Sequence, residues 1–184
     1  MNRFLTTLAA IFMGVFFMSA EAQAQDLENT LYLDLKDGRV VIELLPDLAP
    51  KHVARIKELT RQGFYDGLIF HRVIDGFMAQ GGDPEGTGMG GSGQNLPAEF
   101  SSEPFVRGIL GMARSRDINS GDSQFYIMLG DAPHLNNQYT VWGRVIDGMQ
   151  FVDNIKKGSS RANGEVEGAP DKIERMQVAA DATN

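Results

Sequence analysis

The stretch Phe70–Asp83, which reads FHRVIDGFMAQGGD, is the part of the sequence from which the fold can be inferred most directly. Its first residues alternate as in a short β-strand, so Arg72 is expected to share a face with Phe70 and Ile74. An Asp-Gly turn signal follows, and then a second short apolar run that ends at Gln80. The stretch therefore predicts two strand-like runs that carry a guanidinium into apolar surroundings, where a buried charge is costly unless it is satisfied.

Six further segments read as strands, because polar and apolar residues alternate in them or because they are short apolar runs. They are Thr30–Lys36, Arg39–Leu45, Gly108–Ala113, Ser123–Leu129, Tyr139–Asp147 and Lys172–Val178. Asp37-Gly38, between the first two, is a strong hairpin signal. Helical spacing predicts one helix from Pro50 to Gly63 and a shorter one over Met149–Lys157.

Two histidines are expected to have structural roles only. His52 falls in the first turn of the earlier predicted helix and is expected to be a surface or rim side chain. Strand alternation directs His71 away from Arg72.

The loop Gly81–Gln94, GGDPEGTGMGGSGQ, contains a formal G-x-G-x-x-G match. A dinucleotide site needs that motif between a strand and a helix, and the following residues Asn95–Phe100 do not begin a helix. The match is therefore spurious. It indicates a long glycine-rich loop whose residues can take positive φ.

Composition limits the fold class without deciding it. The 184 residues, of which 42% are hydrophobic, suffice for one domain with a proper core. The 21 glycines between short apolar runs suit a β-rich fold with tight turns. Alternation implies antiparallel strands with one face buried. Both a sandwich and a barrel satisfy these features.

Charge and cysteine content exclude several functions. The net charge of −7 argues against nucleic acid or an anionic membrane as partner, since both need a basic surface. The chain has no cysteine. This excludes disulfides, thiolate metal sites, cysteine nucleophiles and a lipidated cysteine.

Residues 1–24 have the layout of a secretory signal peptide. A positive start at Arg3 precedes the apolar run Phe4–Met18, and two A-x-A sites predict cleavage before Gln23 or Gln25. An uncleaved anchor is the alternative, although the run is short for a membrane span.

The mature domain is expected to comprise residues 25–184. Its net charge stays at −7, because the leader contains one arginine and one glutamate. We expect a soluble exported protein, most simply a periplasmic protein of a Gram-negative bacterium.

The pattern FHR-x-I-x-GFM-x-QGGD resembles the central motif of the cyclophilins, the peptidyl-prolyl cis/trans isomerases. Three later segments are similar to the same family in the same order, namely GILGMARS at Gly108–Ser115, SQFYI at Ser123–Ile127, and the region His134–Met149. Together the matches run from about residue 30 to residue 178. The resemblance implies a mainly β fold, a closed eight-stranded antiparallel barrel capped by two α-helices.

The resemblance also implies the site residues, position by position. Arg72 corresponds to the arginine that acts on the substrate, and Gln80 to the glutamine that holds this arginine in place. The implied substrate-binding positions are Phe77, Met78, Ala113, Arg114, Ser115, Gln124, Tyr126, His134, Leu135 and Tyr139. Phe77, Met78, Tyr126 and Leu135 among them form the proline pocket. No metal and no cofactor are implied, and the partners are proline-containing segments of unfolded or flexible client proteins, bound by a monomer.

Four positions depart from the commonest family pattern. His134 stands in place of tryptophan, Tyr126 in place of phenylalanine, Arg114 in place of asparagine and Tyr139 in place of histidine. None of them alters Arg72. They leave open the affinity for cyclosporin and the preference for the residue before proline.

The chemistry of proline isomerisation suits these residues. The barrier, roughly 18–20 kcal/mol, is the loss of amide resonance. In the twisted transition state the prolyl nitrogen is pyramidal and its lone pair is localised. A donor aimed at that lone pair binds the twisted state better than either planar state, as catalysis requires. Arg72 supplies such a donor without deprotonation, and Gln80 can preorganise it.

Simpler readings exist for the same residues. An isolated arginine more often reaches solvent or meets a core carboxylate, and isolated aromatic residues more often belong to the core. A non-catalytic proline-peptide binding module or chaperone is the main functional alternative. A hydrolase finds no support, because Ser92 lacks the G-x-S-x-G spacing.

Overall fold

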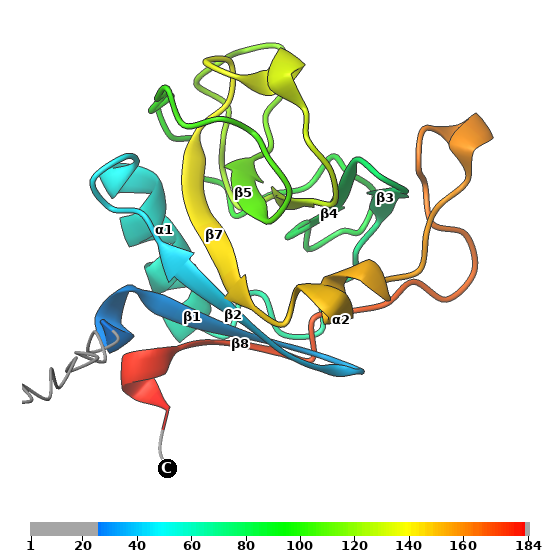
Figure 1. Ribbon diagram of the computed structural model, residues 1–184, viewed down its shortest axis with the longest axis horizontal. Coiled ribbons are helices and arrows are strands. Elements are labelled where there is room, and N and C mark those ends of the chain that lie inside the picture. Colours follow the sequence, from blue (N-terminus) through cyan, green and yellow to red (C-terminus); the bar gives the residue numbers. More distant parts are fainter. Residues whose placement is uncertain (1–25, 183–184) are drawn as a thin grey trace, which may run out of the picture.

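The computed structural model describes residues 26–182, and in this range the chain forms eight strands and two α-helices, as the sequence predicts (Figure 1). The strands are β1 (Thr30–Leu35), β2 (Gly38–Leu44), β3 (Arg72–Ile74), β4 (Met78–Gly81), β5 (Ile109–Met112), β6 (Phe125–Met128), β7 (Val141–Asp147) and β8 (Arg175–Val178). The helices are α1 (Pro50–Arg61) and α2 (Met149–Asp153), and the described range also contains four short 3₁₀ turns. The predicted signal peptide, residues 1–24, lies outside the described residues.

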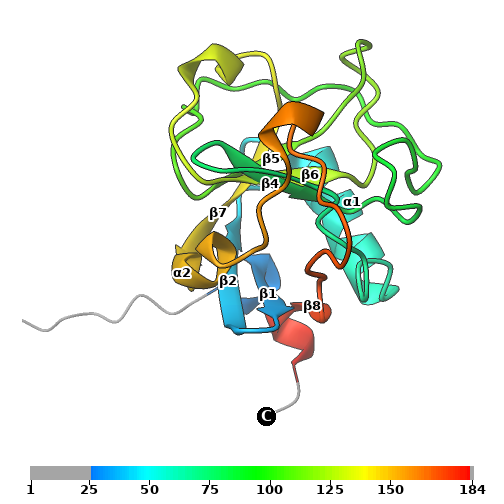
Figure 2. The same cartoon turned by 90° about the vertical axis from the view of Figure 1, so that its right-hand side faces the viewer.

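The eight strands form one antiparallel sheet in the order β3-β4-β6-β5-β7-β2-β1-β8. Figure 2 shows how the sheet curls: β4, β5 and β6 lie at one level, β1, β2 and β8 at another, and β7 runs between them. The predicted hairpin is present, with Leu35 opposite Gly38 across the turn. Helix α1 lies beside the curled sheet.

The expectation of a closed barrel is not confirmed, because β3 and β8, at the two ends of the order, share no ladder. The reason lies in the loop between α2 and β8, which occupies the free edge of β3. Glu165 forms a bridge with Arg72, and Val73 N–H donates to the Gly164 carbonyl at 2.7 Å. The two ends of the sheet are linked only by an isolated antiparallel bridge between Ile69, which precedes β3, and Lys172, which precedes β8. The sheet is thus an open, curled half-barrel.

The main core fills the inside of this curled sheet. Side chains of β1, β2 and β6 meet three residues of α1, Val53, Ile56 and Leu59, and all of them are buried. The hairpin turn allows a further close contact, because a Cβ on Gly38 would lie 2.5 Å from the ring of Phe151, which α2 carries. Burying each large aliphatic side chain contributes roughly 1.5–3 kcal/mol, so this core is the main source of stability.

Strand alternation holds inside β3 but not before it. Val73 and Phe70 both belong to the main core, whereas Ile74 packs against a second apolar cluster on the other face. The expectation that Phe70 shares a face with Arg72 is therefore wrong. Phe70 precedes the first paired residue of β3, so the period of two does not extend to it.

His52 is also not at the rim, as the sequence had suggested, but only 1% exposed. Ala49, at the N-cap of α1, has no capping side chain, and Glu99 from a distant loop takes its place. The Glu99 carboxylate accepts from the backbone N–H groups of Lys51 and His52, and its Oε2 lies 2.7 Å from His52 Nδ1. Burial lowers the pKa of His52, although the Glu99 hydrogen bond opposes this. A remote capping residue therefore accounts for the buried histidine.

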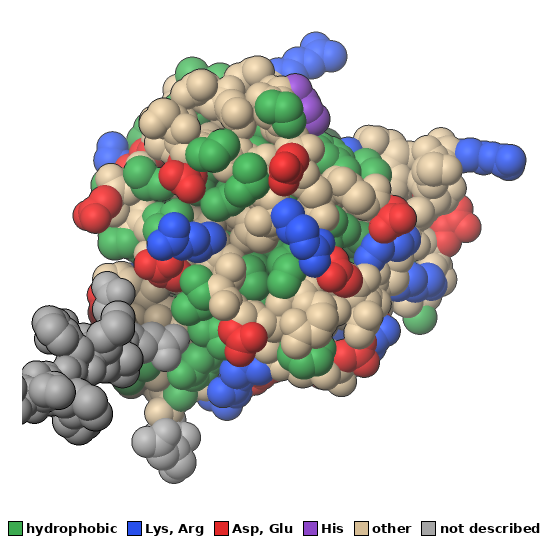
Figure 3. Space-filling model, viewed as in Figure 1, with side chains coloured by type: hydrophobic (Ala, Val, Ile, Leu, Met, Phe, Trp, Pro, Cys, Tyr) green, Lys and Arg blue, Asp and Glu red, His purple; other side chains and the backbone are tan. Residues whose placement is uncertain are grey.

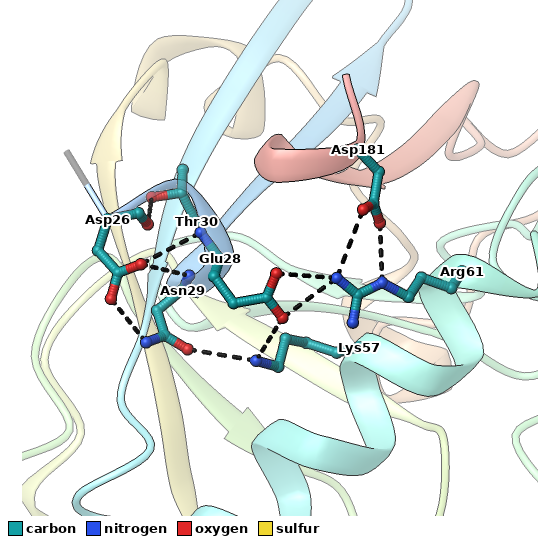
Figure 4. A network of polar contacts seen from close by, with 7 residues as sticks. All are labelled: Asp26, Glu28, Asn29, Thr30, Lys57, Arg61 and Asp181. Carbon is teal, nitrogen blue, oxygen red and sulfur yellow. Dashed lines mark hydrogen bonds and ion pairs between the residues drawn. The ribbon is translucent and has the colours of Figure 1, made fainter. Parts of the chain in front are cut away.

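The two ends of the described chain are tied to α1 by a network of charges (Figure 4). Glu28 pairs with Lys57 at 3.0 Å and with Arg61 at 2.9 Å, and Arg61 also pairs with Asp181 at 2.8 Å. The network therefore joins the segment before β1, the helix and the segment after β8.

On the face shown in Figure 3, acidic and basic side chains are interspersed, with no large patch of one sign. Within residues 26–182, no helix combines the length and the apolar character that a membrane crossing requires.

Candidate active site

The sheet register places the central predicted residues next to one another. Arg72 on β3 lies opposite Gln80 on β4, and Gln80 lies opposite Tyr126 on β6. Directly paired residues of neighbouring antiparallel strands have their Cβ atoms about 4.5–5.5 Å apart on the same face. Three residues from two distant motifs thus form one row across three strands.

This row borders an apolar cluster that is separate from the main core. The cluster joins buried residues of β4, β5, β6 and β7 to the loops around residues 105 and 135. Its buried members are Met78, Phe105, Ile109, Tyr126, Met128, Ala132, Leu135 and Val141. Phe77, Ala113 and Tyr139 pack against it and are partly buried. The outer face of the sheet therefore has its own apolar wall.

A cavity of about 120 Å³ opens between this wall and Arg72. Every residue that lines it is a predicted site residue, namely Arg72, Phe77, Met78, Gln80, Ala113, Arg114, Tyr126, Leu135 and Tyr139. The space suits one small ring or side chain rather than a nucleotide. The predicted residues, which lie up to 67 positions apart in the sequence, thus meet in one small cavity, which we call the proline pocket after the role that the family resemblance implies.

The three remaining predicted residues lie next to this pocket rather than in it. Ser115 and Gln124 line a neighbouring cavity of about 280 Å³, which shares Gln80, Ala113 and Arg114 with the proline pocket. His134 lies at the rim, where its ring is tilted by 32° against that of Phe77 at a centroid distance of 5.7 Å. His134 therefore contacts the pocket wall and not the cavity.

Arg72 is held by three hydrogen bonds to neutral oxygens. Its Nη1 donates to Gln80 Oε1 at 3.1 Å, its Nε to the backbone oxygen of Asn163 at 2.9 Å, and its Nη2 to Asn163 Oδ1 at 3.1 Å. Within residues 26–182, no carboxylate forms an ion pair with it. Burial lowers the pKa of the Arg72 guanidinium, which nevertheless stays charged at any physiological pH. Its positive charge is therefore fixed in place and not cancelled.

A chain of side-chain amides continues from Arg72 along the sheet. Gln80 Nε2 donates to Gln124 Oε1 at 3.0 Å, and Gln124 Nε2 donates to the carbonyl of Gly90 at 2.8 Å. With its oxygen on Arg72, the Gln80 amide can present only its NH₂ group to Gln124. This fixes the orientation of both amides and links Arg72 to the glycine-rich loop.

The glycine-rich loop folds around a carboxylate. Asp83 is 1% exposed and accepts backbone hydrogen bonds from Glu85, Thr87 and Gly88. Burial alone would raise the pKa of Asp83, but these donors lower it. A Cβ on Gly90 would collide with the same carboxylate. The glycines therefore allow the loop to fold closely around the Asp83 carboxylate, and this loop forms part of the wall of the neighbouring cavity.

Arg114 lines both cavities, and its side chain is held in place there by several contacts. Its guanidinium lies 4.4 Å from the ring centroid of Tyr139. It donates twice to the carbonyl of Gln138, at 3.3 and 3.0 Å, and once to that of Ser115, at 3.0 Å. A second fixed positive charge thus borders the proline pocket.

Tyr126 is fitted to a glycine on the opposite strand. The two residues are paired between β5 and β6, and a Cβ on Gly111 would collide with the ring and hydroxyl of Tyr126. Tyr126 is 5% exposed, its hydroxyl has no partner among the described residues, and burial raises its pKa. Gly111 therefore makes room for the hydroxyl that distinguishes Tyr126 from phenylalanine.

Two residues of the site were not found from the sequence. Asn163, which contacts Arg72, belongs to no motif that the chain displays, and its only signal is the Asn-Gly turn that it begins. Gly111 falls inside the predicted strand Gly108–Ala113, and no pattern in the sequence marks it as a site residue.

A larger groove lies elsewhere on the described part of the chain. It has a volume of about 950 Å³, is bordered by β2, β7 and the segment before β1, and contains none of the predicted site residues. Its one arginine, Arg144, pairs with Glu43 at 2.6 Å. Size alone therefore does not identify the site, and we give more weight to the convergence of residues at the proline pocket.

Comparison with known proteins agrees with this convergence. Residues 30–178 match the family model described as cyclophilin type peptidyl-prolyl cis-trans isomerase/CLD. A probable peptidyl-prolyl cis-trans isomerase of Brucella suis is 57% identical over 172 residues, which cover 87% of each chain. Peptidyl-prolyl cis-trans isomerase B of Bacillus subtilis is 44% identical over 143 residues, covering 76% of this chain and 99% of that one.

Solved structures show the same fold. A cyclophilin from Hirschia baltica superposes with a TM-score of 0.76 at 27% identity, covering 86% of this chain and 76% of its own. A cyclophilin-type isomerase of Cryptosporidium parvum, crystallised in the presence of the dipeptide Ala-Pro, superposes with a TM-score of 0.73 at 30% identity, covering 84% and 99%.

Proposed function

The chain belongs to the cyclophilin family of peptidyl-prolyl cis-trans isomerases, and from this premise we propose that it accelerates proline-limited protein folding in the periplasm, acting on proline-containing segments of client proteins. The enzyme class follows from the family. The compartment, the clients and the roles of individual residues are our proposal.

In the proposed reaction the proline pocket anchors one side of the bond that rotates. The pyrrolidine ring lies against Phe77, Met78, Tyr126 and Leu135, which line the cavity. Burying such a ring supplies about 2 kcal/mol of binding energy. The other side of the bond remains free to turn, so isomerisation does not require release of the ring.

Arg72 lowers the barrier by favouring the twisted state. As resonance is lost, the lone pair of the prolyl nitrogen becomes available, and a free N–H of the guanidinium can donate to it. Gln80 and Asn163 hold the guanidinium before the substrate arrives, so little reorganisation is needed at the moment of reaction. No bond is made or broken, and no proton changes place.

The observation that carries this proposal is the absence of charge compensation at Arg72. Among the described residues its hydrogen-bond partners are amide oxygens and the Met78 sulfur, all of them neutral, although the protein has a net charge of −7. A binding module would gain nothing from a fixed, uncancelled donor beside an apolar pocket. A donor at a transient lone pair needs this arrangement.

The proposed substrate and compartment rest on two further observations. The relative from Cryptosporidium parvum was crystallised with a dipeptide that contains proline, which favours proline segments as substrate here. Residues 1–24, read as a signal peptide, favour export to the periplasm. We propose a mature monomer that begins at residue 23 or 25.

A refolding assay tests the activity. Wild-type protein should accelerate the slow, proline-limited phase of a substrate protein, and Arg72→Ala should lose about 99% of this effect, since one aligned donor is worth about 10²–10³ in rate. Equal acceleration by both proteins would overturn the mechanism. If neither accelerates refolding while both bind a proline peptide, the chain is a binding module.

Export is tested by the mass of the protein recovered from cells. A periplasmic species that begins at residue 23 or 25 is expected. A full-length species in the membrane fraction would indicate an anchor instead.

A further inference from the structure

A loop far from the catalytic motif holds one edge of Arg72. This loop lies between α2 and β8, where the short 3₁₀ turn Ser160–Ala162 leads into Asn163. Figure 1 shows it beside β3, and its register on β3 is set by the bridge between Glu165 and Arg72. Arg72 and Asn163 are 91 positions apart in the sequence, so only the tertiary fold brings them together.

Asn163 contacts the guanidinium through two different oxygens. Its backbone oxygen accepts from Arg72 Nε at 2.9 Å, and its side-chain Oδ1 accepts from Nη2 at 3.1 Å. The Oε1 atom of Gln80 accepts a hydrogen bond from Nη1 at 3.1 Å. Three of the five guanidinium N–H groups are thus engaged by oxygens, and these partners come from two sides. Nη1 also lies 3.9 Å from Met78 Sδ, which is a weak acceptor. Among the described residues, the second N–H of Nη2 has no partner and is left for a substrate.

The backbone at Asn163 would accept glycine more readily than asparagine. Asn163 has φ 51° and ψ 34°, and among the described non-glycine residues only Asn137 also has a positive φ. A residue with a Cβ carries an energetic cost in this region, which glycine does not. Hence the backbone does not explain why a side chain is present here, whereas the contact with Arg72 does.

The loop is held to β3 without the Asn163 side chain. Gly164 N–H donates to the Ser159 carbonyl at 2.8 Å, and the Gly164 carbonyl accepts from Val73 at 2.7 Å. Ser159 N–H donates to the Glu165 carbonyl at 2.9 Å. Removing the amide of Asn163 should therefore leave the loop in place and release only Arg72 Nη2.

We propose that Asn163 is a positioning residue of the isomerase, which fixes the plane of the Arg72 guanidinium from the side opposite Gln80. This rests on the proposed function of Arg72. Without the Asn163 side chain, Gln80 and the backbone oxygen of residue 163 would still hold Nη1 and Nε, but none of the described residues would hold Nη2. With Asn163 in place, the donors on Nη1 and Nη2 point in a fixed direction toward the proline pocket. A small misplacement of a catalytic group is costly to rate, so the effect should appear in kcat.

The test compares Asn163→Gly with Asn137→Gly. Both changes relieve a positive φ, but only the first removes a contact with Arg72. Asn163→Gly should lower kcat about three- to tenfold on a proline peptide, the range of a hydrogen bond to a charged group that is partly replaced by water. Its KM should stay within twofold of wild type, and its melting temperature should not fall. Asn137→Gly should leave kcat unchanged.

A second measurement reports on Arg72 directly. In wild type the Nη groups of Arg72 should give separate nuclear magnetic resonance signals at low temperature, because rotation about the Cζ–Nη bonds is hindered. In Asn163→Gly the Nη2 signals should merge. Unchanged kcat, or signals as well resolved as in wild type, would overturn the proposal.

The two proposals fail in different ways. If wild type itself does not accelerate isomerisation, the proposed function is wrong. If wild type is active and Asn163→Gly matches it, only the role of Asn163 is wrong.

Discussion

Arg61 and Arg72 are both held by several hydrogen bonds, yet their surroundings are opposite in kind. Arg61, on α1, donates to the carboxylates of Glu28 and Asp181, and its side chain is 43% exposed (Figure 4). Its pKa is raised, chiefly by the hydrogen bond to Asp181. Arg72 donates to amide oxygens of Gln80 and Asn163, and burial lowers its pKa.

The difference shows what each arginine can do. The charge of Arg61 is cancelled by its partners, so this side chain joins α1 to both ends of the described chain and offers little to a ligand. The charge of Arg72 is positioned but not cancelled, so its field is directed at the proline pocket. A neutral partner holds a cation without weakening its electric field. A carboxylate holds the cation too, but its negative charge weakens that field.

Giving Arg72 a carboxylate partner should make it resemble Arg61. In Gln80→Glu the new carboxylate cancels the charge of Arg72, and the NH₂ group that donates to Gln124 is lost. We expect kcat/KM to fall about tenfold or more on a proline peptide, because the donor then binds the protein more strongly than the transition state. Stability should not decrease, as judged by thermal unfolding.

Gln62→Glu is the matched control for that experiment. It adds the same charge at the exposed C-terminal end of α1, far from the pocket, and should leave kcat/KM unchanged. If Gln80→Glu is as active as wild type, the neutral surroundings of Arg72 do not matter for rate.

Removing Arg61 should affect stability and not activity. In Arg61→Met the links to Glu28 and Asp181 are lost, and we expect the free energy of unfolding in urea to fall by about 1 kcal/mol. The loss should shrink at about 1 M salt, because exposed charges are then screened.

The control for Arg61 is Lys51→Met on the same helix. Lys51 forms no ion pair with any residue in the range 26–182, and its charge lies in the first turn of α1, where a cation is unfavourable. No loss of stability is expected. A drop in kcat/KM on Arg61→Met would contradict the separation of the two arginines.

The smallest effect is expected at Arg114. Like Arg72 it borders the proline pocket, but we propose no direct action of Arg114 on the rotating bond. It is locked by carbonyl oxygens and by Tyr139, and no carboxylate lines the proline pocket. Wild type should therefore prefer glutamate over lysine beside the proline. In Arg114→Gln the ratio of kcat/KM values for these two peptides should fall two- to fourfold at low salt. An unchanged ratio would show that Arg114 does not select substrates.

Residues near one another in the sequence were predicted well. The hairpin of β1 and β2 follows from an Asp-Gly turn between alternating segments, and it forms as expected. The residues that the family resemblance implies for the proline pocket do line one cavity, because each lies in a short motif that the sequence shares with the family. The errors occurred where a local rule was extended too far, as at Phe70, which lies just outside the paired part of β3.

His52 illustrates a different kind of error. Its position in the first turn of a helix predicted exposure, and the structure instead buries it against Glu99, 47 positions later. No pattern near His52 announces that partner. The same holds for Gly111, whose importance depends on the hydroxyl of Tyr126 on the neighbouring strand.

The sequence by itself determined the strands and the turns between them, since alternation and turn chemistry act over a few positions of the backbone. The residues of the pocket came from the resemblance of its motifs to those of the family. Only the tertiary structure decided that the sheet stays open between β3 and β8, and that the loop carrying Asn163 fills that edge. Both depend on hydrogen bonds between segments about 90 positions apart, and such contacts leave no period in the sequence. The positive charge of Arg72 follows from the residue type alone, whereas its contact with Asn163 could not be predicted from the sequence.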